Sequence, residues 1–556
     1  MGSIDMGMPS PAYTDMGMPS LAYTDMGMPS PAYLDMAAPS PAPSPAPSTT
    51  APDGAHMGYY RDYSMALLAR SGPSQLPKLP CLLSVDDMAN GRDIFPIGKG
   101  HAILDAWHGK GGCLERIVDL LDGLTWNSVN AFRVGWENPT KWTKPVPTIL
   151  ITVYSLSVQL ADDLADRCRC LLQKSFKLGD VAVEIAQGNA THGSSAINNE
   201  YCNNHELWRL HNTWHMDHNK IPIIGTGIGV AGTGGLGTLG FYVRITKGDK
   251  SEVMAATCHH VVDPPKGTRL KLAFPIRACH GVVIESRSLK DQMLWETYLQ
   301  HRRHTAESMR QVAATQLGRE NLENMLVTAL NARLAKFNEE IAAVDKMMAD
   351  QGSRSLGKVF LSSGLPGPFK PDTDRKYAPD WALIRLDSDR VTDVSALTNI
   401  WHDFIFHKHP GMPPSLKFRR CHPNYHPKYY ATEALASKLK HGGPITVYKF
   451  GLSTSATSGR LNELMSKVLI FNTGRIPTYS LVWVVLGEFG APGGGWFSRP
   501  GDSGSLVVDV YGTAVGMVVA RRVRTYVMPM EAILDMMREA LEVDFRAEGE
   551  VQVDLV

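Results

Sequence analysis

The stretch that decides the fold is Gly501-Asp502-Ser503-Gly504-Ser505, followed directly by the apolar run 506–510. A serine between small residues, on a tight turn that enters a strand, presents its Oγ beside backbone N–H groups that can bind an oxyanion. Glycine, aspartate and serine are also the residues that any surface turn prefers. The pentapeptide therefore indicates either a nucleophile at Ser503 or an ordinary turn.

Two further segments favour the nucleophile. Residues 252–262 read as a strand of small and β-branched residues that ends in Thr257-Cys-His-His260. Between this strand and the serine, Asp380 stands at the start of the apolar run 381–386. The order along the chain is thus histidine, aspartate, serine, as in the chymotrypsin arrangement and unlike that of subtilisin or the α/β-hydrolases.

These motifs resemble the trypsin- and chymotrypsin-like serine peptidase family, most closely the large trypsin-like proteins of filamentous fungi. The family patterns Thr-Ala-Ala-His, Asp-Ile-Ala-Leu and Gly-Asp-Ser-Gly-Gly read here as Thr-Cys-His-His260, Asp380-Trp-Ala-Leu and Gly-Asp-Ser503-Gly-Ser. Residues 447–459 are similar to a strand, turn and strand of the family's second barrel. The resemblance covers residues 222–290 and 356–542.

The resemblance implies a mainly β fold, with a chymotrypsin-like double antiparallel β-barrel over residues 222–545. It implies a serine endopeptidase that acts on proteins or peptides through an acyl-enzyme on Ser503, with no cofactor and no metal. His260 takes the serine proton, Asp380 fixes the histidine tautomer, and the N–H groups of Gly501 and Ser503 bind the oxyanion. In the family, the aspartate at position 502 pairs with a buried positive group.

Neighbouring residues compete for two of these roles. His260 is preferred over His259 because the family's threonine lies three residues before it. On a strand, His259 points to the opposite face, and we expect it to be solvated or hydrogen-bonded. The other acidic candidates lack a following apolar strand: Asp372, Asp374 and Asp387.

The substrate pocket departs from the family. Counting back from Ser503 as in the family places Phe497 on the pocket floor. Residues 516–521 resemble the family's wall strand, which implies that Ala520 and Arg521 lie on the wall. No acidic floor for basic side chains is visible, and an arginine wall either favours acidic or small side chains or closes the pocket. A closed pocket leaves the alternative of a catalytically silent scaffold or signalling module.

A long insertion separates His260 from Asp380. Residues 289–317 and 321–348 are rich in helix-forming residues and contain no proline, and Gly318 suits a helix stop. Apolar residues follow the spacing of a coiled-coil seam: Leu330, Leu334, Phe337, Ile341, Val344 and Met348. We expect a helical hairpin within residues 287–350, with arms about 45 Å long. It either packs on the barrel or mediates protein docking or self-association.

The rest of the chain has three expected parts. Residues 1–56, with three decapeptide repeats at 5–34, have the composition of a disordered tail. Residues 148–154, 158–172 and 181–185 read as strand, helix and strand, a β-α-β unit in an N-terminal α/β accessory module over 57–200. A C-terminal helix is expected near 530–541, with a buried face: Ile533, Leu534, Met537 and Leu541.

Composition narrows the function classes. The chain has 56 basic and 55 acidic residues, so its charge does not favour nucleic acid. It shows no signal-peptide pattern and no run of about 18 apolar residues, so we expect a cytoplasmic protein without membrane contact. Eight cysteines without a paired spacing favour a reducing compartment. Histidine-rich segments at 202–218 and 402–426 lack a zinc-binding spacing, and we expect them in polar loops.

Overall fold

The computed structural model describes residues 66–73, 93–135, 145–187, 222–233, 236–263, 281–286, 289–318, 324–349, 355–364, 376–389, 391, 428–472, 477–487, 496–521, 524–545 and 550–556. The expected tail at 1–56 lies outside these residues. Both histidine-rich segments also lie outside them, as do four of the eight cysteines: Cys81, Cys202, Cys279 and Cys421.

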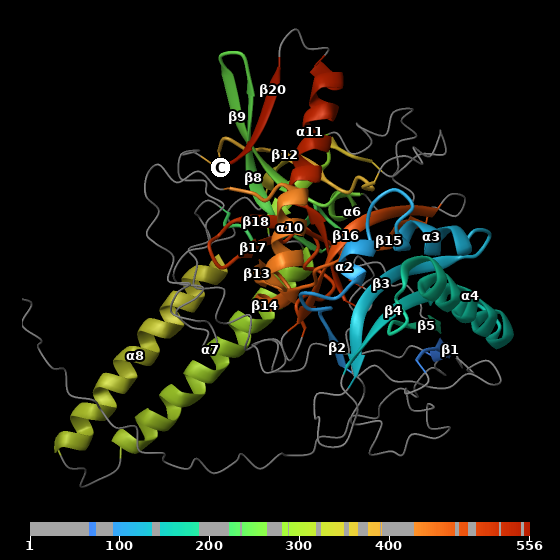
Figure 1. The fold of residues 1–556 in the computed structure, drawn as a ribbon. Coiled ribbons are helices and arrows are strands. Elements are labelled where there is room, and N and C mark those ends of the chain that lie inside the picture. The colour runs from blue at the N-terminus through green and yellow to red at the C-terminus, as the bar shows by residue number, and fades with distance from the viewer. Residues whose placement is uncertain are drawn as a thin grey trace, which may run out of the picture. The chain divides into compact units, whose positions relative to one another are not determined.

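The fold is mainly β, and six of its strands close into an antiparallel barrel (Figure 1). Around the ring these are β13 (Thr446–Gly451), β14 (Ser455–Leu461), β16 (Pro477–Gly487), β19 (Thr525–Pro529), β18 (Ala514–Arg521) and β17 (Leu506–Asp509). The ring closes because β16 pairs with both β14 and β19. Its apolar residues alternate between two clusters: Trp483 and Val485 belong to one, Val482 and Val484 to the other.

A second, eight-stranded antiparallel sheet has the order β20-β8-β9-β12-β11-β10-β6-β7. Its strands are β20 (Val551–Leu555), β8 (Phe241–Lys247), β9 (Lys250–Thr257), β12 (Ala382–Leu386), β11 (Ser355–Ser362), β10 (Val283–Ser286), β6 (Gly227–Val230) and β7 (Gly237–Thr238). Strand β20 lies beyond the expected end of the peptidase domain at 545. One apolar cluster contains residues of this sheet and of the barrel, including Phe241, Leu383 and Met517.

The expected β-α-β unit is present near the N-terminus. Strand β4 (Val146–Val153) leads through α4 (Val158–Phe176) to β5 (Ala182–Gln187), which pairs with β4 in parallel. The helix buries one stripe against the sheet: Ala161, Leu164, Ala165, Cys168 and Leu172. Strands β1 (Ala66–Ser71) and β3 (Trp126–Gly135) flank the unit, with β2 (Asp93–Phe95) and helices α2 (Ile103–Ala106) and α3 (Cys113–Leu120).

This N-terminal sheet is continuous with the barrel, which the sequence did not predict. Strand β3 pairs with β15 (Ser466–Asn472), and β15 pairs with β16 of the barrel. Buried polar groups reinforce the join, because Asn462 Nδ2 donates to the carbonyl of Ala131 at 3.1 Å. The indole of Trp107 donates to the carbonyl of Met465 at 2.8 Å. The N-terminal module is therefore an extension of the barrel sheet.

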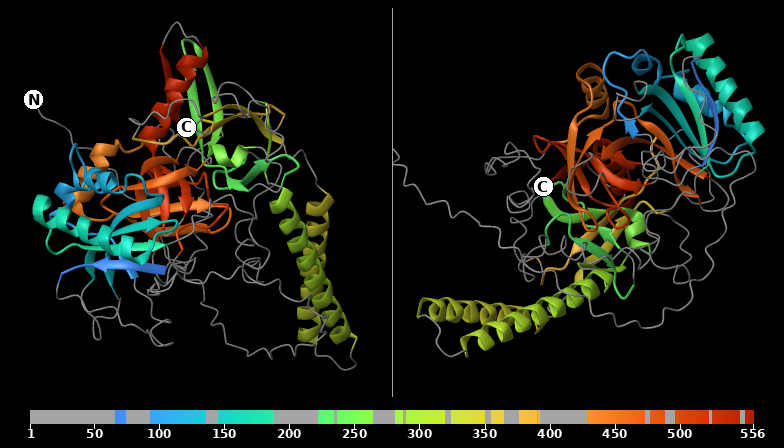
Figure 2. Two further views of the ribbon diagram at one scale, coloured as in Figure 1. Left: turned by 90° about the vertical axis from the view of Figure 1, so that its right-hand side faces the viewer. Right: turned by 90° about the horizontal axis from the view of Figure 1, so that it is seen from below.

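Two long helices lie between β10 and β11. Helices α7 (Leu289–Leu317) and α8 (Asn324–Ala349) contact each other and lie side by side in both views of Figure 2. Leu330 is buried, and Leu334, Phe337 and Ile341 are half-buried, as a seam requires. Helix α7 buries two alanines, Ala306 and Ala313. The side chains of Val344 and Met348 lie outside the described residues.

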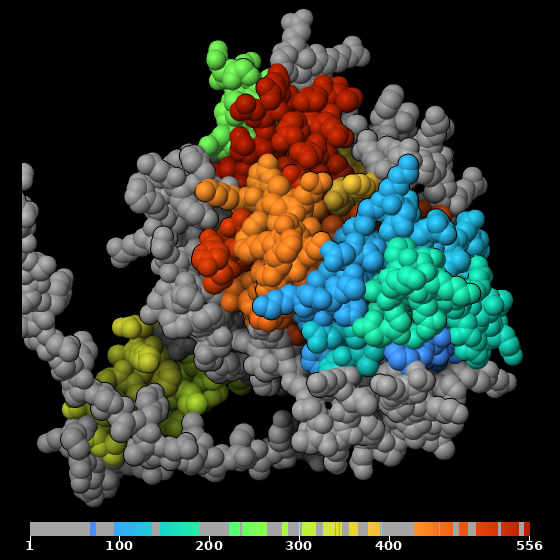
Figure 3. Space-filling view, viewed as in Figure 1, coloured from blue at the N-terminus to red at the C-terminus, as the bar shows by residue number. Residues whose placement is uncertain are grey.

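Two helices cover the barrel on the face shown in Figure 3, where α10 (Thr432–Gly442) is orange and α11 (Met530–Phe545) is red. Helix α11 extends past the expected end at 541 and buries all four residues predicted to face the core: Ile533, Leu534, Met537 and Leu541. Lys440 of α10 forms an ion pair with Asp105 of α2. Among the described helices, none is both long and apolar enough to cross a membrane.

Candidate active site

Strand pairing brings His260 and Asp380 together. Residue Ala382, the first of β12, lies opposite Thr257, the last of β9. His260 follows β9 in the short helix α6 (His259–Val262), and Asp380 precedes β12. His260 Nδ1 lies 2.8 Å from Asp380 Oδ2, and the His260 backbone N–H donates to Asp380 Oδ1 at 3.2 Å. One carboxylate thus fixes both the ring and the backbone of the histidine.

Each member of the pair stabilises the charge of the other. Burial by itself lowers the pKa of His260, but the charge of Asp380 and its hydrogen bond outweigh burial, so the pKa lies above its usual value. Burial likewise raises the pKa of Asp380, but the charge and hydrogen bonds of His260 outweigh it, so that pKa lies below its usual value. Asp380 is therefore a carboxylate that stabilises an imidazolium.

The other ring nitrogen of the histidine is the chemically available one. His260 Nε2 is buried and has no hydrogen-bond partner among the described residues. Because a carboxylate accepts the proton of Nδ1, the neutral imidazole carries no proton on Nε2. A buried nitrogen whose lone pair is not engaged in a hydrogen bond is suited to take a proton from a neighbouring hydroxyl.

The turn that carries Ser503 is hydrogen-bonded to the histidine side of the site. Thr238 donates from its backbone N–H to the carbonyl of Ser503 and from its Oγ1 to the carbonyl of Gly501, each at 2.8 Å. Thr257 Oγ1 in turn donates to the carbonyl of Thr238 at 2.8 Å. These contacts connect the serine turn to β7 and to the end of β9, the strand that leads into His260.

A shared acceptor also connects the two sides. The carbonyl of Val518 accepts from Gly504 N at 2.8 Å and from the Cys258 thiol at 3.3 Å. Gly504 directly follows Ser503, and Cys258 lies two residues before His260. Ser503 Oγ and His260 Nε2 are not hydrogen-bonded to each other in this structure. These contacts hold the serine and histidine segments together, although the two side chains do not form a hydrogen bond with each other.

Glycine is required on both sides of the serine. Gly501 has φ +99° and Gly504 has φ +96°, a conformation that side chains rarely adopt. A Cβ on Gly504 would also lie 2.3 Å from the Thr238 carbonyl oxygen. The N–H groups of Gly501 and Ser503 donate to no other group in the described part of the chain. Two such N–H groups in one turn can bind an oxyanion.

The structure describes the side chains of two of the three predicted pocket residues. Phe497 is buried, and its carbonyl accepts from Thr457 Oγ1 at 2.7 Å. Next to it, Ser498 Oγ and Thr525 Oγ1 share a hydrogen bond of 2.6 Å. Ala520 is half-buried on β18. Arg521 ends β18, and its side chain lies outside the described residues.

The residues that the sequence offered as alternatives to His260 and Asp380 do not form the same hydrogen-bonded pair. His259 is 1% exposed, which excludes the solvated alternative for this residue and leaves the hydrogen-bonded one. Residues 259–262 form a helical turn, so the alternation of a strand does not apply to them. Asp387 accepts a hydrogen bond from Ser355 at the far end of β12. Asp372 and Asp374 lie outside the described residues.

Cys258, His260 and Asp380 have possible metal-ligand atoms within 4.8 Å of one another. Metal binding needs a deprotonated thiol and an available ring nitrogen. Burial raises the pKa of the Cys258 thiol well above its usual value, and the thiol donates to Val518. Asp380 engages Nδ1 of the histidine. The donor set fits a hydrogen-bonded pair better than a metal site.

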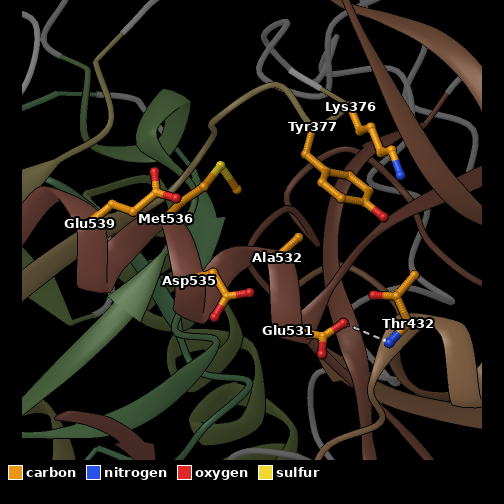
Figure 4. A pocket seen from close by; sticks show the side chains of 8 residues that line it. All are labelled: Lys376, Tyr377, Thr432, Glu531, Ala532, Asp535, Met536 and Glu539. Carbon is orange, nitrogen blue, oxygen red and sulfur yellow. Dashed lines mark hydrogen bonds between the residues drawn. The ribbon is translucent and has the colours of Figure 1, made fainter. Parts of the chain in front are cut away.

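A pocket of about 270 Å³ lies elsewhere, beside α11 (Figure 4). It contains three carboxylates spaced along the helix, Glu531, Asp535 and Glu539, with Lys376 and Tyr377 on the opposite side. Glu531 Oε2 accepts the backbone N–H of Thr432 at 2.8 Å and so caps α10. The pocket includes none of the residues predicted for catalysis.

Two contributors to the site were missed or left unnamed by sequence reasoning. Thr238, in a glycine-rich segment, gave no signal. The buried positive group expected for Asp502 is Lys449, 3.1 Å away. The sequence feature that could have revealed it is the single lysine inside the apolar strand Val447-Tyr-Lys-Phe450.

No protein-family model and no curated protein matches the chain.

Proposed function

We propose that this chain is a serine endopeptidase that hydrolyses peptide bonds through an acyl-enzyme on Ser503. The observation that carries the proposal is the His260–Asp380 hydrogen bond of 2.8 Å, with His260 Nε2 buried and unbonded. A glycine-flanked serine turn with two available N–H groups is attached to the same segments. These are a base, its orienting carboxylate, a nucleophile and oxyanion donors.

The proposed reaction follows from these groups. Ser503 Oγ attacks the substrate carbonyl while its proton passes to His260 Nε2, and the resulting imidazolium is stabilised by Asp380. The N–H groups of Gly501 and Ser503 bind the oxyanion. The imidazolium then protonates the leaving amine as the carbon–nitrogen bond breaks and an ester remains on Ser503. Water, deprotonated by His260, hydrolyses that ester and regenerates the serine.

The proposal extends to the architecture. The closed barrel supplies Ser503 and the eight-stranded sheet supplies His260 and Asp380, which supports a chymotrypsin-like double barrel with the eight-stranded sheet as its first half. Helices α7 and α8 then form a helical hairpin inserted between β10 and β11 of that half. We further propose a cytoplasmic location, and the hairpin as a surface for a protein partner or a second copy.

Labelling with a fluorophosphonate probe tests this function. The full-length chain should react, with the adduct mapped to Ser503 by mass spectrometry. Ser503→Ala and His260→Ala should abolish labelling with little change in thermal stability, whereas the exposed Ser437→Ala should react as the parent does. Labelling that persists in Ser503→Ala would refute the assignment. No labelling of the folded parent chain would favour the silent-scaffold alternative.

A further inference from the structure

Two serine hydroxyls outside the proposed catalytic residues bond to carbonyls of the serine turn. Ser453 Oγ, on the turn between β13 and β14, donates to the carbonyl of Pro500 at 2.5 Å. Ser505, directly before β17, donates to the carbonyl of Asp502 twice, from its Oγ at 2.6 Å and from its backbone N–H at 3.0 Å. Ser505 is 0% exposed and Ser453 is half-buried. Neither hydroxyl takes part in the proposed proton transfer, so the two act on the turn itself.

Each of these carbonyls belongs to the peptide unit that carries one of the two proposed oxyanion donors. The carbonyl of Pro500 and the N–H of Gly501 are in one unit, and the carbonyl of Asp502 and the N–H of Ser503 are in another. A trans peptide is planar, and its C=O and N–H point in opposite directions. A hydroxyl that fixes the carbonyl therefore fixes the direction of the N–H. The same hydrogen bond polarises the peptide and strengthens the N–H as a donor.

Two glycines leave the space that these hydroxyls occupy. A Cβ on Gly501 would lie 2.3 Å from Ser453 Oγ. A Cβ on Gly451 would lie 2.5 Å from Ser505 Oγ and 2.6 Å from Asp502 Oδ1. The φ of Gly451 is not positive, so close packing rather than backbone conformation excludes a side chain there. The fold thus provides a fitted position for each hydroxyl beside the carbonyl that it holds.

The two hydroxyls lie outside what the family resemblance implies. Ser505 stands where the family pattern has its last glycine. The contact that the resemblance does imply is made by the Asp502 carboxylate, and Ser453 reaches that carboxylate through its backbone N–H, at 2.8 Å. Replacing either serine by alanine therefore removes a hydroxyl and leaves the hydrogen bonds of the carboxylate in place.

We propose that Ser453 and Ser505 are positioning residues, each of which orients one oxyanion donor by holding the carbonyl of its peptide unit. Ser453 orients the N–H of Gly501, and Ser505 orients the N–H of Ser503. The inference rests on the proposed function and deepens it. Donors that are already oriented need no reorganisation when the oxyanion forms. Loss of either hydroxyl leaves the N–H present but less well oriented, so the effect falls on the transition state.

The test compares Ser453→Ala and Ser505→Ala with Ser128→Ala in the full-length chain. Ser128 is the matched control because it is also 0% exposed and shares a hydrogen bond of 2.7 Å, but with Thr152 in the N-terminal sheet. Each test variant should lower the fluorophosphonate acylation rate and kcat by about tenfold, less than the loss of about 100-fold or more on removing a donor. KM for a peptide should stay within about threefold, because the donors act on the transition state. The control should keep the parent rate.

Two further readouts separate positioning from general damage. Ser453→Thr should keep the parent rate, because threonine retains the hydroxyl. The acid limb of the pH profile should not move in either alanine variant, because the pair of His260 and Asp380 is unchanged. Thermal unfolding would show which variants fold, and the two Ser453 variants complete the test if Ser505→Ala does not.

Three results would overturn the inference. These are a parent rate in a folded alanine variant, an equal loss in Ser453→Thr and Ser453→Ala, and a raised KM with unchanged kcat. The last would assign the serines to substrate binding. Failure of the folded parent chain to react with the probe would instead overturn the proposed function.

Discussion

Replacing Asp380 by asparagine should reverse the proton positions on His260. The asparagine keeps the size of the side chain, and its Oδ1 can still accept the His260 backbone N–H, now 3.2 Å away. Its Nδ2 then occupies the position of the oxygen that lies 2.8 Å from His260 Nδ1. An amide N–H cannot face a ring N–H, so Nδ1 becomes the acceptor and Nε2 carries the proton. That nitrogen can no longer take the proton of Ser503.

The loss should be about 10⁴-fold in kcat, as for the same change in a working triad. This corresponds to about 5.4 kcal/mol at 1.36 kcal/mol for each factor of ten. The pH dependence should change as well. Asp380 raises the pKa of His260 against the effect of burial, so its neutralisation should lower that pKa. The residual activity should therefore begin to rise at a lower pH than in the parent.

Fluorophosphonate inactivation and single-turnover ester cleavage, measured from about pH 5 to pH 9, would follow both effects. Asp387→Asn is the matched control, because Asp387 follows the same strand and bonds to Ser355. Thermal unfolding would show that each variant is folded. A loss below about tenfold, or an acid limb that does not move, would refute the role of Asp380 as the orienting carboxylate.

Two further predictions follow from the geometry, and a third follows from the pocket assignment made on the sequence. Gly504→Ala should abolish labelling or soluble expression, because φ is +96° there and the new Cβ would lie 2.3 Å from the Thr238 oxygen. Gly442→Ala, with no positive φ and nothing within 4 Å, should retain both, and equal behaviour of the two would contradict this account. Replacing residues 287–354 by a short Gly/Ser linker should preserve labelling and remove any self-association, because Glu285 and Ser355 are paired across β10 and β11; loss of soluble protein would make α7 and α8 part of the core. A peptide library should show poor cleavage after lysine or arginine, and Arg521→Gly should widen the range of accepted side chains; strong cleavage after basic residues would show that the pocket assignment is wrong.

Local patterns predicted the elements whose signal lies in consecutive residues. The β-α-β unit, α7, α8 and α11 follow from hydrophobic periodicity, and their observed bounds differ from the predicted ones by a few residues. The pairing of β3 with β15 was not predictable, because these strands are separated by more than 300 residues and neither sequence indicates which strand it pairs with. The sequence did not predict the burial of His259, because residues 259–262 form a helical turn where the end of a strand was expected.

By itself, the sequence predicted His260, Asp380 and Ser503 as the catalytic residues, because each stands in a short motif whose residue types suit one chemical role. The resemblance to the serine peptidase family implied that Asp502 has a buried positive partner. Only the tertiary structure decided which residue that is, because Lys449 comes within 3.1 Å of Asp502 when β13 and β17 pair in the closed barrel. The same holds for Thr238, whose two hydrogen bonds to the serine turn exist because two sheets meet there. A short motif indicates the chemical role of individual residues, whereas contacts between distant strands depend on the tertiary fold of the whole chain.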